Sequence, residues 1–173
     1  MLRYGAFAAV LCLFANVGRA DDEELTKFTS KAGKFSVSLP GKPMEQTKKV
    51  PAGGMDIDMF MFIVAPSDDR VYLVTYSDYD KALVTDDNKD AILDGAAKGS
   101  ITNLKGKTLK NEEITIGKHP GRELLVELPN KSQYRAQIYL VNNRLYQVVA
   151  LGPKSFVKSE TTDDYFKSFK LAK

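Results

Sequence analysis

The feature that most constrains this fold is a pair of neighbouring segments that are apolar on both sides of an extended chain. Residues 55–64 begin with alternating apolar and acidic side chains and then become continuously apolar. Residues 71–76 follow after the turn residues 66–69 and are almost entirely β-branched and aromatic. Alternation marks a strand with one buried face, whereas a continuous apolar run marks a strand buried on both. The chain therefore needs a sheet with a cover on each face, and helices are the natural cover.

Five further segments have the composition of strands. Residues 35–39 alternate apolar and polar side chains and end at Pro40-Gly41, and the other four are residues 113–116, 123–128, 134–141 and 145–151. We predict a hairpin turn at residues 51–54, a type II turn at His119-Pro120-Gly121-Arg122 and a two-residue hairpin turn at Asn142-Asn143. Strands joined this tightly have to be antiparallel.

A helix is predicted between the two groups of strands, after the capping residues Thr85-Asp86-Asp87. Gly106 is placed to end this helix. Gly95 and Gly99 weaken its interior but would allow it to lie close to the sheet. Apolar residues recur at helical spacing along it, namely Leu93, Ala97, Ile101 and Leu104.

A second, short helix is indicated near the C-terminus. Thr161 and Asp164 have the spacing of a capping box, and Tyr165, Phe166 and Phe169 give the helix an apolar side. The order of strands, helix, strands and helix predicts an α+β fold, in which a central antiparallel sheet of about six to eight strands has helices on both faces. Residues 33–173 form this single domain, because no linker, low-complexity tract or repeat interrupts them.

Residues 1–20 have the layout of a secretory signal peptide. Arg3 precedes an apolar run over residues 6–17, and Gly18-Arg19-Ala20 precedes Asp21. The apolar run is shorter than the roughly 20 residues that cross a bilayer. We therefore predict cleavage after Ala20 and export to a periplasm or to the medium, with no transmembrane segment left. Residues 21–32, which open with an acidic run, are predicted to be a flexible lead-in.

Cleavage would remove several function classes. Cys12, the only cysteine, lies inside the predicted signal peptide, so the mature chain would have no disulfide, thiolate nucleophile or thiolate metal site. Loss of Arg3 and Arg19 lowers the formal net charge of +3 by two. A nearly neutral domain has no overall field that attracts nucleic acid, so no nucleic-acid partner is predicted.

The predicted order opens with Gly33-Lys34-Phe35-Ser36-Val37-Ser38-Leu39-Pro40 and closes with Tyr165-Phe166-Lys167-Ser168-Phe169. In this it resembles the PsbP-like family, which is named for an extrinsic subunit of the photosynthetic oxygen-evolving complex. The resemblance covers nearly all of the predicted mature chain. It implies a central antiparallel sheet with helices on both faces and a non-catalytic accessory or assembly role. The sequence contains no family motif from which binding residues can be transferred.

Candidate catalytic and metal-binding residues are few. His119 is the only histidine and lies beside a predicted turn, so a zinc or copper site would lack its usual second donor. Asp86, Asn88 and Asp90 match the start of a calcium loop, but Ala91 occupies the position that needs glycine. We therefore predict neither a metal site nor a cofactor.

Pairs of carboxylates are also poor candidates for acid–base catalysis. Glu123 and Glu127 share a strand face at a separation of about 13 Å, which exceeds the spacing in glycosidases. Asp56 and Asp58 alternate with apolar residues and are expected on a solvated strand face. The sequence also lacks a nucleophile elbow, a phosphate-binding loop and a dinucleotide fingerprint. We predict that the protein is not an enzyme.

A basic stretch lies near the end of the first predicted helix. Residues 96–111 contain no acidic residue but include Lys98, Lys105, Lys107 and Lys110. These lysines are a candidate docking patch for an acidic partner, a lipid headgroup or a cell-wall polymer. The alternative is a solvated helix end, which the helix dipole favours.

The sequence thus favours an exported, non-catalytic accessory or binding protein, a monomer that acts with an unknown protein or cell-envelope partner. The alternative function is a carrier of a small apolar ligand, suggested by Met55, Met59 and Met61 beside Phe60 and Phe62. Ordinary sheet core explains the same five residues.

Overall fold

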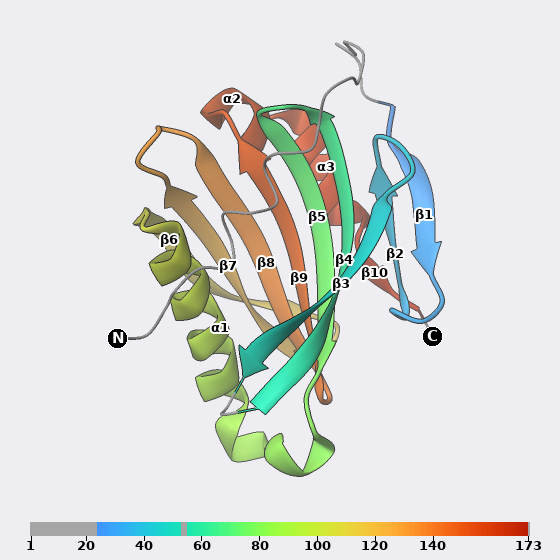
Figure 1. Ribbon diagram of the computed structural model, residues 1–173, viewed down its shortest axis with the longest axis vertical. Coiled ribbons are helices and arrows are strands. Elements are labelled where there is room, and N and C mark those ends of the chain that lie inside the picture. Colours follow the sequence, from blue (N-terminus) through green and yellow to red (C-terminus); the bar gives the residue numbers. More distant parts are fainter. Residues whose placement is uncertain (1–23, 53–54, 173) are drawn as a thin grey trace.

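The computed structural model describes residues 24–52 and 55–172, and the predicted signal peptide, residues 1–20, lies outside the described residues. Seven strands form one antiparallel sheet at the centre of the fold (Figure 1). In spatial order these strands are β3 (Met44–Ala52), β4 (Met55–Ser67), β5 (Arg70–Asp78), β9 (Arg144–Gly152), β8 (Gln133–Val141), β7 (His119–Glu127) and β6 (Lys107–Ile116).

The two strands that are apolar on both sides, β4 and β5, lie within this sheet. Along β4, Phe62 belongs to the core on one face of the sheet, while the next residue, Ile63, is buried on the other face. Along β5, Val74 belongs to the same core as Phe62, whereas Leu73 packs against the core on the other face of the sheet. The sheet is therefore buried on both faces, as the sequence predicts.

One face is covered by helix α1 (Lys89–Leu104), which packs on β7 and β8 (Figure 1). Two short 3-10 helices, η2 (Lys81–Leu83) and η3 (Asp86–Asn88), precede it, and η3 begins with a capping box between Thr85 and Asn88. The buried residues of α1 meet side chains of the sheet in one core: Leu93, Ala97, Leu124, Val126, Tyr134, Ala136, Ile138, Leu140, Leu145 and Val149.

The glycines of α1 and its end act differently from the prediction. The left-handed cap of the helix is Lys105, with a φ of 50°, rather than Gly106. Gly106 instead passes so close to β7 that an added Cβ would lie 2.3 Å from Cγ1 of Val126. The predicted role of Gly95 and Gly99 in close approach to the sheet is wrong, because a Cβ built at either position would have only open space within 4 Å.

The opposite face is covered by a small sheet and two short helices. The small sheet has the order β1 (Thr26–Ser30), β2 (Phe35–Leu39) and β10 (Lys170–Leu171), and the helices are α2 (Lys154–Val157) and α3 (Glu160–Ser168). Aromatic side chains fill the space between these layers: Phe35, Phe62, Tyr72, Tyr76, Tyr139, Tyr146, Phe156, Tyr165, Phe166 and Phe169.

Tyrosine hydroxyls attach the second layer to the main sheet. The hydroxyl of Tyr165 of α3 donates a bifurcated hydrogen bond to the carbonyl oxygens of Leu73 and Val149, at 3.0 and 3.3 Å. Tyr146 of β9 donates to the carbonyl oxygen of Gly33, just before β2, at 2.7 Å. A buried hydroxyl without a partner costs free energy, so these bonds favour one position of the layer over the sheet.

The structure corrects three expectations about strands. Residues 35–39 form a strand, but it belongs to the small sheet rather than the main one. Strand β1 falls within residues 21–32, the predicted flexible lead-in, and pairs with β2 along its whole length. Strand β3 was not predicted because it is an edge strand with mainly polar side chains, where Lys49 and Pro51 suit an exposed edge.

Two local signals were also misassigned. The predicted turn at residues 119–122 is part of β7, and the hairpin turn is formed by Gly117-Lys118, where Gly117 has a φ of 59°. The cap of α3 is Ser159, whose Oγ accepts from the main-chain N–H of Thr162, rather than Thr161. The predicted hairpin turn at residues 142–143 is confirmed, with Asn142 at a φ of 56°.

These elements confirm the expected fold class, an α+β fold whose central antiparallel sheet carries helices on both faces. Within residues 24–52 and 55–172, no helix is both long and apolar enough to cross a membrane.

Candidate functional site

A hollow of about 170 Å³ opens on the face of the main sheet that carries α2 and α3. It exists because α2 packs on β8 and β9 and ends at Val157, so the neighbouring part of β7 and β6 is left without a helix above it. The residues that line it are Lys110, Glu123, Leu124, Leu125, Arg135, Val157 and Lys158.

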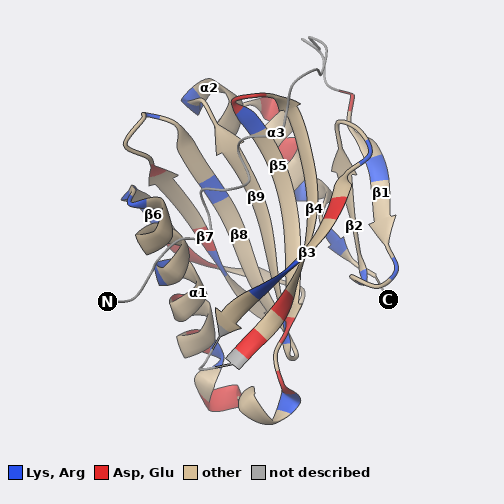
Figure 2. Ribbon diagram, viewed as in Figure 1, with Lys and Arg blue, Asp and Glu red and all other residues tan. Residues whose placement is uncertain are grey.

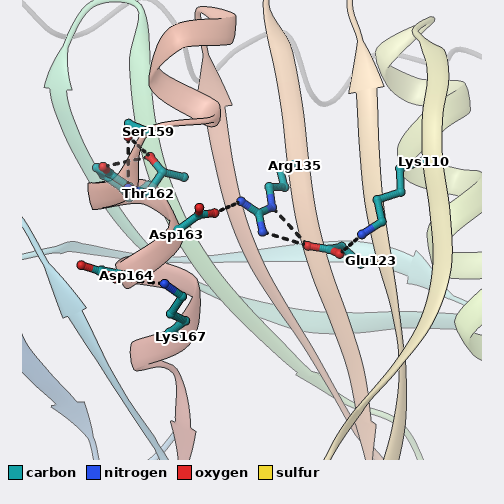
Figure 3. A network of polar contacts seen from close by, with 9 residues as sticks. Lys110, Glu123, Arg135, Ser159, Thr162, Asp163, Asp164 and Lys167 are labelled. Carbon is teal, nitrogen blue, oxygen red and sulfur yellow. Dashed lines mark hydrogen bonds and ion pairs between the residues drawn. The ribbon is translucent and has the colours of Figure 1, made fainter.

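The hollow is built around a buried carboxylate, that of Glu123 (Figure 3). Its Oε2 accepts a hydrogen bond from Nζ of Lys110 at 2.5 Å, and its Oε1 accepts from Nη2 and Nε of Arg135 at 3.0 and 3.2 Å. Arg135 also donates from Nη1 to Oδ1 of Asp163 at 2.5 Å. The network therefore connects three strands of the sheet to helix α3.

Helix α3 holds the far end of this network in place. Ser159 caps the helix at the main-chain N–H of Thr162, and the buried Thr162 hydroxyl lies 3.3 Å from the hydroxyl of Tyr72. Asp163 follows in the first turn and faces Arg135 (Figure 3). The Arg135 guanidinium lies 4.5 Å from the ring centre of Phe166, one turn further on. Arg135 is thus fixed by charge on one side and by an aromatic ring on the other.

The network keeps its members charged. Burial raises the pKa of Glu123, but hydrogen bonds from Lys110 and Arg135 lower it by more, so the pKa lies below its ordinary value. Hydrogen bonds to Glu123 and Glu112 raise the pKa of Lys110. A carboxyl that is hard to protonate and an amine that is hard to deprotonate bind oppositely charged groups well but are poor general acids and bases at neutral pH.

The predicted lysine patch is divided by the structure. Lys110 turns into the hollow and pairs with Glu112 as well as Glu123. Lys98, Lys105 and Lys107 remain exposed around the end of α1 and the start of β6 (Figure 2). Lys110 therefore belongs to the hollow, and the other three lysines belong to a separate surface.

The remaining candidates are accounted for by local structure. Asn88 accepts a hydrogen bond from the main-chain N–H of Thr85 as part of the helix cap, and Asp86 pairs with Lys89. His119 lies at the start of β7, where burial, with Lys118 and Lys89 nearby, lowers its pKa. In the described part of the chain, no group of three or more His, Cys, Asp and Glu side chains is arranged to hold a metal ion.

Two other groups of candidate residues are not brought together by the structure. Glu127 pairs with Lys131 rather than with anything that Glu123 contacts. Met61 and Phe62 are both buried but, as neighbours in a strand, point to opposite faces of the main sheet. Met61 and Phe62 therefore do not line one common pocket.

The Glu123 network was not predicted, although the sequence contains a signal for it. Arg122-Glu123 directly precedes the apolar residues 124–126 in a strand that is paired on both sides, and Arg135 lies beside the buried Tyr134 and Ala136 in the next strand. Charged residues at such positions need partners, because an unpaired buried charge is costly. What the sequence does not show is which partner each one finds.

A comparison with solved structures agrees with this fold. The solution structure of cyanobacterial PsbP (CyanoP) from Synechocystis sp. PCC 6803 is 12% identical in sequence, with 91% of this chain and 98% of that chain covered and a TM-score of 0.55. The fold of this chain is thus PsbP-like, as the resemblance in sequence implies. No protein-family model matches the sequence, and no curated protein is significantly similar to it.

Proposed function

We propose that this chain is an exported, non-catalytic accessory protein that binds a partner at the hollow around Glu123. The observation that carries the proposal is a buried carboxylate, satisfied by two cations, at the floor of a surface concavity. Charges are expensive to bury even in pairs. Such a network at an open surface is explained if a second molecule binds over it.

The lining of the hollow supports binding rather than catalysis. Its titratable side chains are those of Lys110, Glu123, Arg135 and Lys158. The pKa shifts of Glu123 and Lys110 both favour the charged form, which opposes proton transfer near neutral pH. These side chains suit the recognition of a polar partner.

The size of the hollow favours a protein partner over a free ligand. Small-molecule sites usually enclose about 300–1,000 Å³, whereas this hollow has a volume of about 170 Å³. Leu125 and Val157 provide an apolar wall beside the charged rim. A pocket of this size, with an apolar wall beside charged groups, can anchor one side chain of a protein partner. A carrier of an apolar ligand would need a larger enclosed space.

The predicted cleavage site supports export of an intact domain. Strand β1 begins at Thr26, so cleavage after Ala20 leaves the whole strand in the mature chain. The expected N-terminus of the exported protein is therefore Asp21. N-terminal sequencing of the protein from the extracytoplasmic fraction checks this, and an N-terminus beyond Thr26 would contradict it.

The binding site is tested by crosslinking in the exported fraction with two matched variants. Lys154 and Lys158 are both exposed, one at the start of α2 and one just after its end, but only Lys158 lines the hollow. Lys158→Glu should reduce the partner recovered, whereas Lys154→Glu should not. Equal recovery with both variants would place the partner elsewhere. Recovery of no stable partner at native abundance would count against an accessory role.

A further inference from the structure

Charge is strongly separated along helix α1. Residues 78–94 contain six aspartates and two lysines, whereas residues 95–111 contain four lysines and no acidic residue. The helix of 16 residues, which is about 24 Å long, joins these two segments. Figure 2 shows the acidic residues around the lower end of α1 and basic residues around its upper end. Helix α1 therefore runs from an acidic end to a basic end.

Three segments meet at the basic end: the end of α1, the start of β6 and the turn between β7 and β8. We define the basic corner as the exposed residues Lys98, Lys105, Lys107, Leu109 and Lys131. Glu127 is the acidic residue among them, opposite Lys107 in the β6–β7 register and 3.4 Å from Nζ of Lys131. One carboxylate among four lysines leaves the corner with a clear positive charge.

The backbone fixes how the corner presents its lysines. An added Cβ at Gly106 would lie 2.3 Å from Cγ1 of Val126 and 2.9 Å from the carbonyl oxygen of Glu127, so the chain is pressed against β7 there. Lys105 has a φ of 50°, in the left-handed region that a residue with a side chain rarely adopts. Lys105 and Lys107 therefore flank a tightly packed point and are held at the surface.

Leu109 is an apolar residue that the fold leaves in solvent at this corner. It is the extra residue of a bulge between Thr108 and Lys110 in the edge strand β6, and 45% of it is exposed. A bulge protects an edge from pairing with other chains, but a charged side chain would serve that purpose better. The exposure of a leucine among lysines is thus not explained by protection of the edge.

We propose that the basic corner docks the domain on the surface of an anionic lipid bilayer, with Leu109 entering the headgroup region. A surface of this kind attracts clustered lysines by net charge, and an apolar side chain adds to the binding. A specific protein interface would be expected to use arginine and aromatic anchors, which the corner does not contain. The acidic end of α1 would point away from the bilayer. This inference does not depend on the hollow.

Insertion of Leu109 is tested with two single-tryptophan variants, since the chain has no tryptophan of its own. Leu109→Trp places the probe in the basic corner, and Leu83→Trp places it at an equally exposed position near the acidic end, at 45% and 46% exposure. We expect vesicles of phosphatidylcholine and phosphatidylglycerol to shift the fluorescence of Leu109→Trp to the blue and to leave Leu83→Trp unchanged. Equal shifts, or no shift for Leu109→Trp, would overturn the proposal.

The role of charge is tested by vesicle binding of protein purified from the exported fraction. Each lysine near an anionic surface strengthens binding about fivefold, so Lys105→Ala with Lys107→Ala should weaken it about 25-fold. Lys27→Ala with Lys31→Ala removes the same charge from β1 and its turn, on the opposite side of the molecule (Figure 1), and should have little effect. Equal losses from the two double variants, or tighter binding to soluble polyglutamate than to the vesicles, would overturn the lipid assignment.

Discussion

Two consecutive residues of β7, Arg122 and Glu123, point to opposite faces of the main sheet, and each is a buried charge. On the α1 face, Arg122 meets Asp94 at 3.0 Å, with Asp90 and Glu113 at 3.6 and 3.7 Å, and all three carboxylates are mostly in solvent. On the other face, Glu123 is held by Arg135 and Lys110, which are better shielded. An ion pair is weakened when one of its partners lies in solvent, because water and salt screen it. The network that reaches α3 should therefore contribute more than the one that reaches α1.

The apolar contacts of α1 are also weaker than those of the layer on the opposite face. Helix α1 has two fully buried residues, Leu93 and Ala97, over its 16 positions. The opposite layer places Phe35 of β2 and Phe169, which follows α3, in a continuous aromatic core. Segments with few buried apolar contacts open first when a protein fluctuates. We therefore expect α1 to be the layer that separates most readily, and the following changes test this comparison.

The largest effect is expected from Phe35→Ala. Phe35 is fully buried, and its ring centre lies 5.3 Å from that of Phe62 and 5.6 Å from that of Phe169. Removing the ring should lower the free energy of unfolding by about 3–5 kcal/mol. Denaturant unfolding measures this, with the exposed Leu83→Ala as a control that should change it by less than about 0.5 kcal/mol. A loss below about 1 kcal/mol for Phe35→Ala would show that the aromatic layer is not the stronger cover.

Leu93→Ala makes the corresponding cavity on the α1 face. Leu93 is also fully buried, but apart from Ala97 the residues of α1 that pack on this core are only partly buried, so we expect the helix to shift into the space. The loss should therefore lie near the lower end of the usual range for leucine, about 2–3 kcal/mol. Hydrogen exchange should show faster opening of the amides of α1 while those of β5 and β9 keep their protection. A cost equal to that of Phe35→Ala would contradict the comparison.

Glu123→Gln tests the charged network and its dependence on pH. The variant keeps the shape of the side chain but loses charge-assisted bonds to Lys110 and Arg135, which should cost about 2 kcal/mol at neutral pH. The pKa of Glu123 is lowered in the folded state, so its stabilising contribution is complete above the ordinary pKa and is lost as the pH falls through the folded one. The difference between the two proteins should therefore shrink as the pH falls below the ordinary glutamate pKa of about 4.3.

Glu127→Gln is the matched control for this measurement. Glu127 lies on the same face of the same strand, but its partner Lys131 is largely in solvent, so the change should cost less than about 0.5 kcal/mol at any pH. If the difference between wild type and Glu123→Gln stays constant from neutral to acidic pH, the network does not hold Glu123 in its charged form.

These two faces also show what the sequence can and cannot predict. The strands β4 and β5 were predictable because burial on both faces of the sheet requires a continuous run of apolar residues, which is visible in the sequence. Strand β3 has no such mark, since its place is decided by pairing with β4 rather than by burial of its own side chains. Arg135 and Asp163 are 28 residues apart in the chain, and their meeting depends on where α3 lies over β8. Contacts of this kind require the packed layers and are not visible in any local pattern.

The smallest expected effect is a gain in stability from Gly95→Ala and Gly99→Ala. Both glycines lie within α1, and an added methyl group at either position would have open space around it. Alanine should therefore stabilise the helix by about 0.5–1 kcal/mol at each position, because it loses less backbone freedom on folding. Gly106→Ala is the control and should destabilise, since its Cβ would meet Val126 and the main chain of Glu127. If α1 is the weaker cover, the double variant should slow hydrogen exchange in α1 more than in the aromatic layer. Uniform slowing through both layers would mean that α1 opens only when the whole domain unfolds.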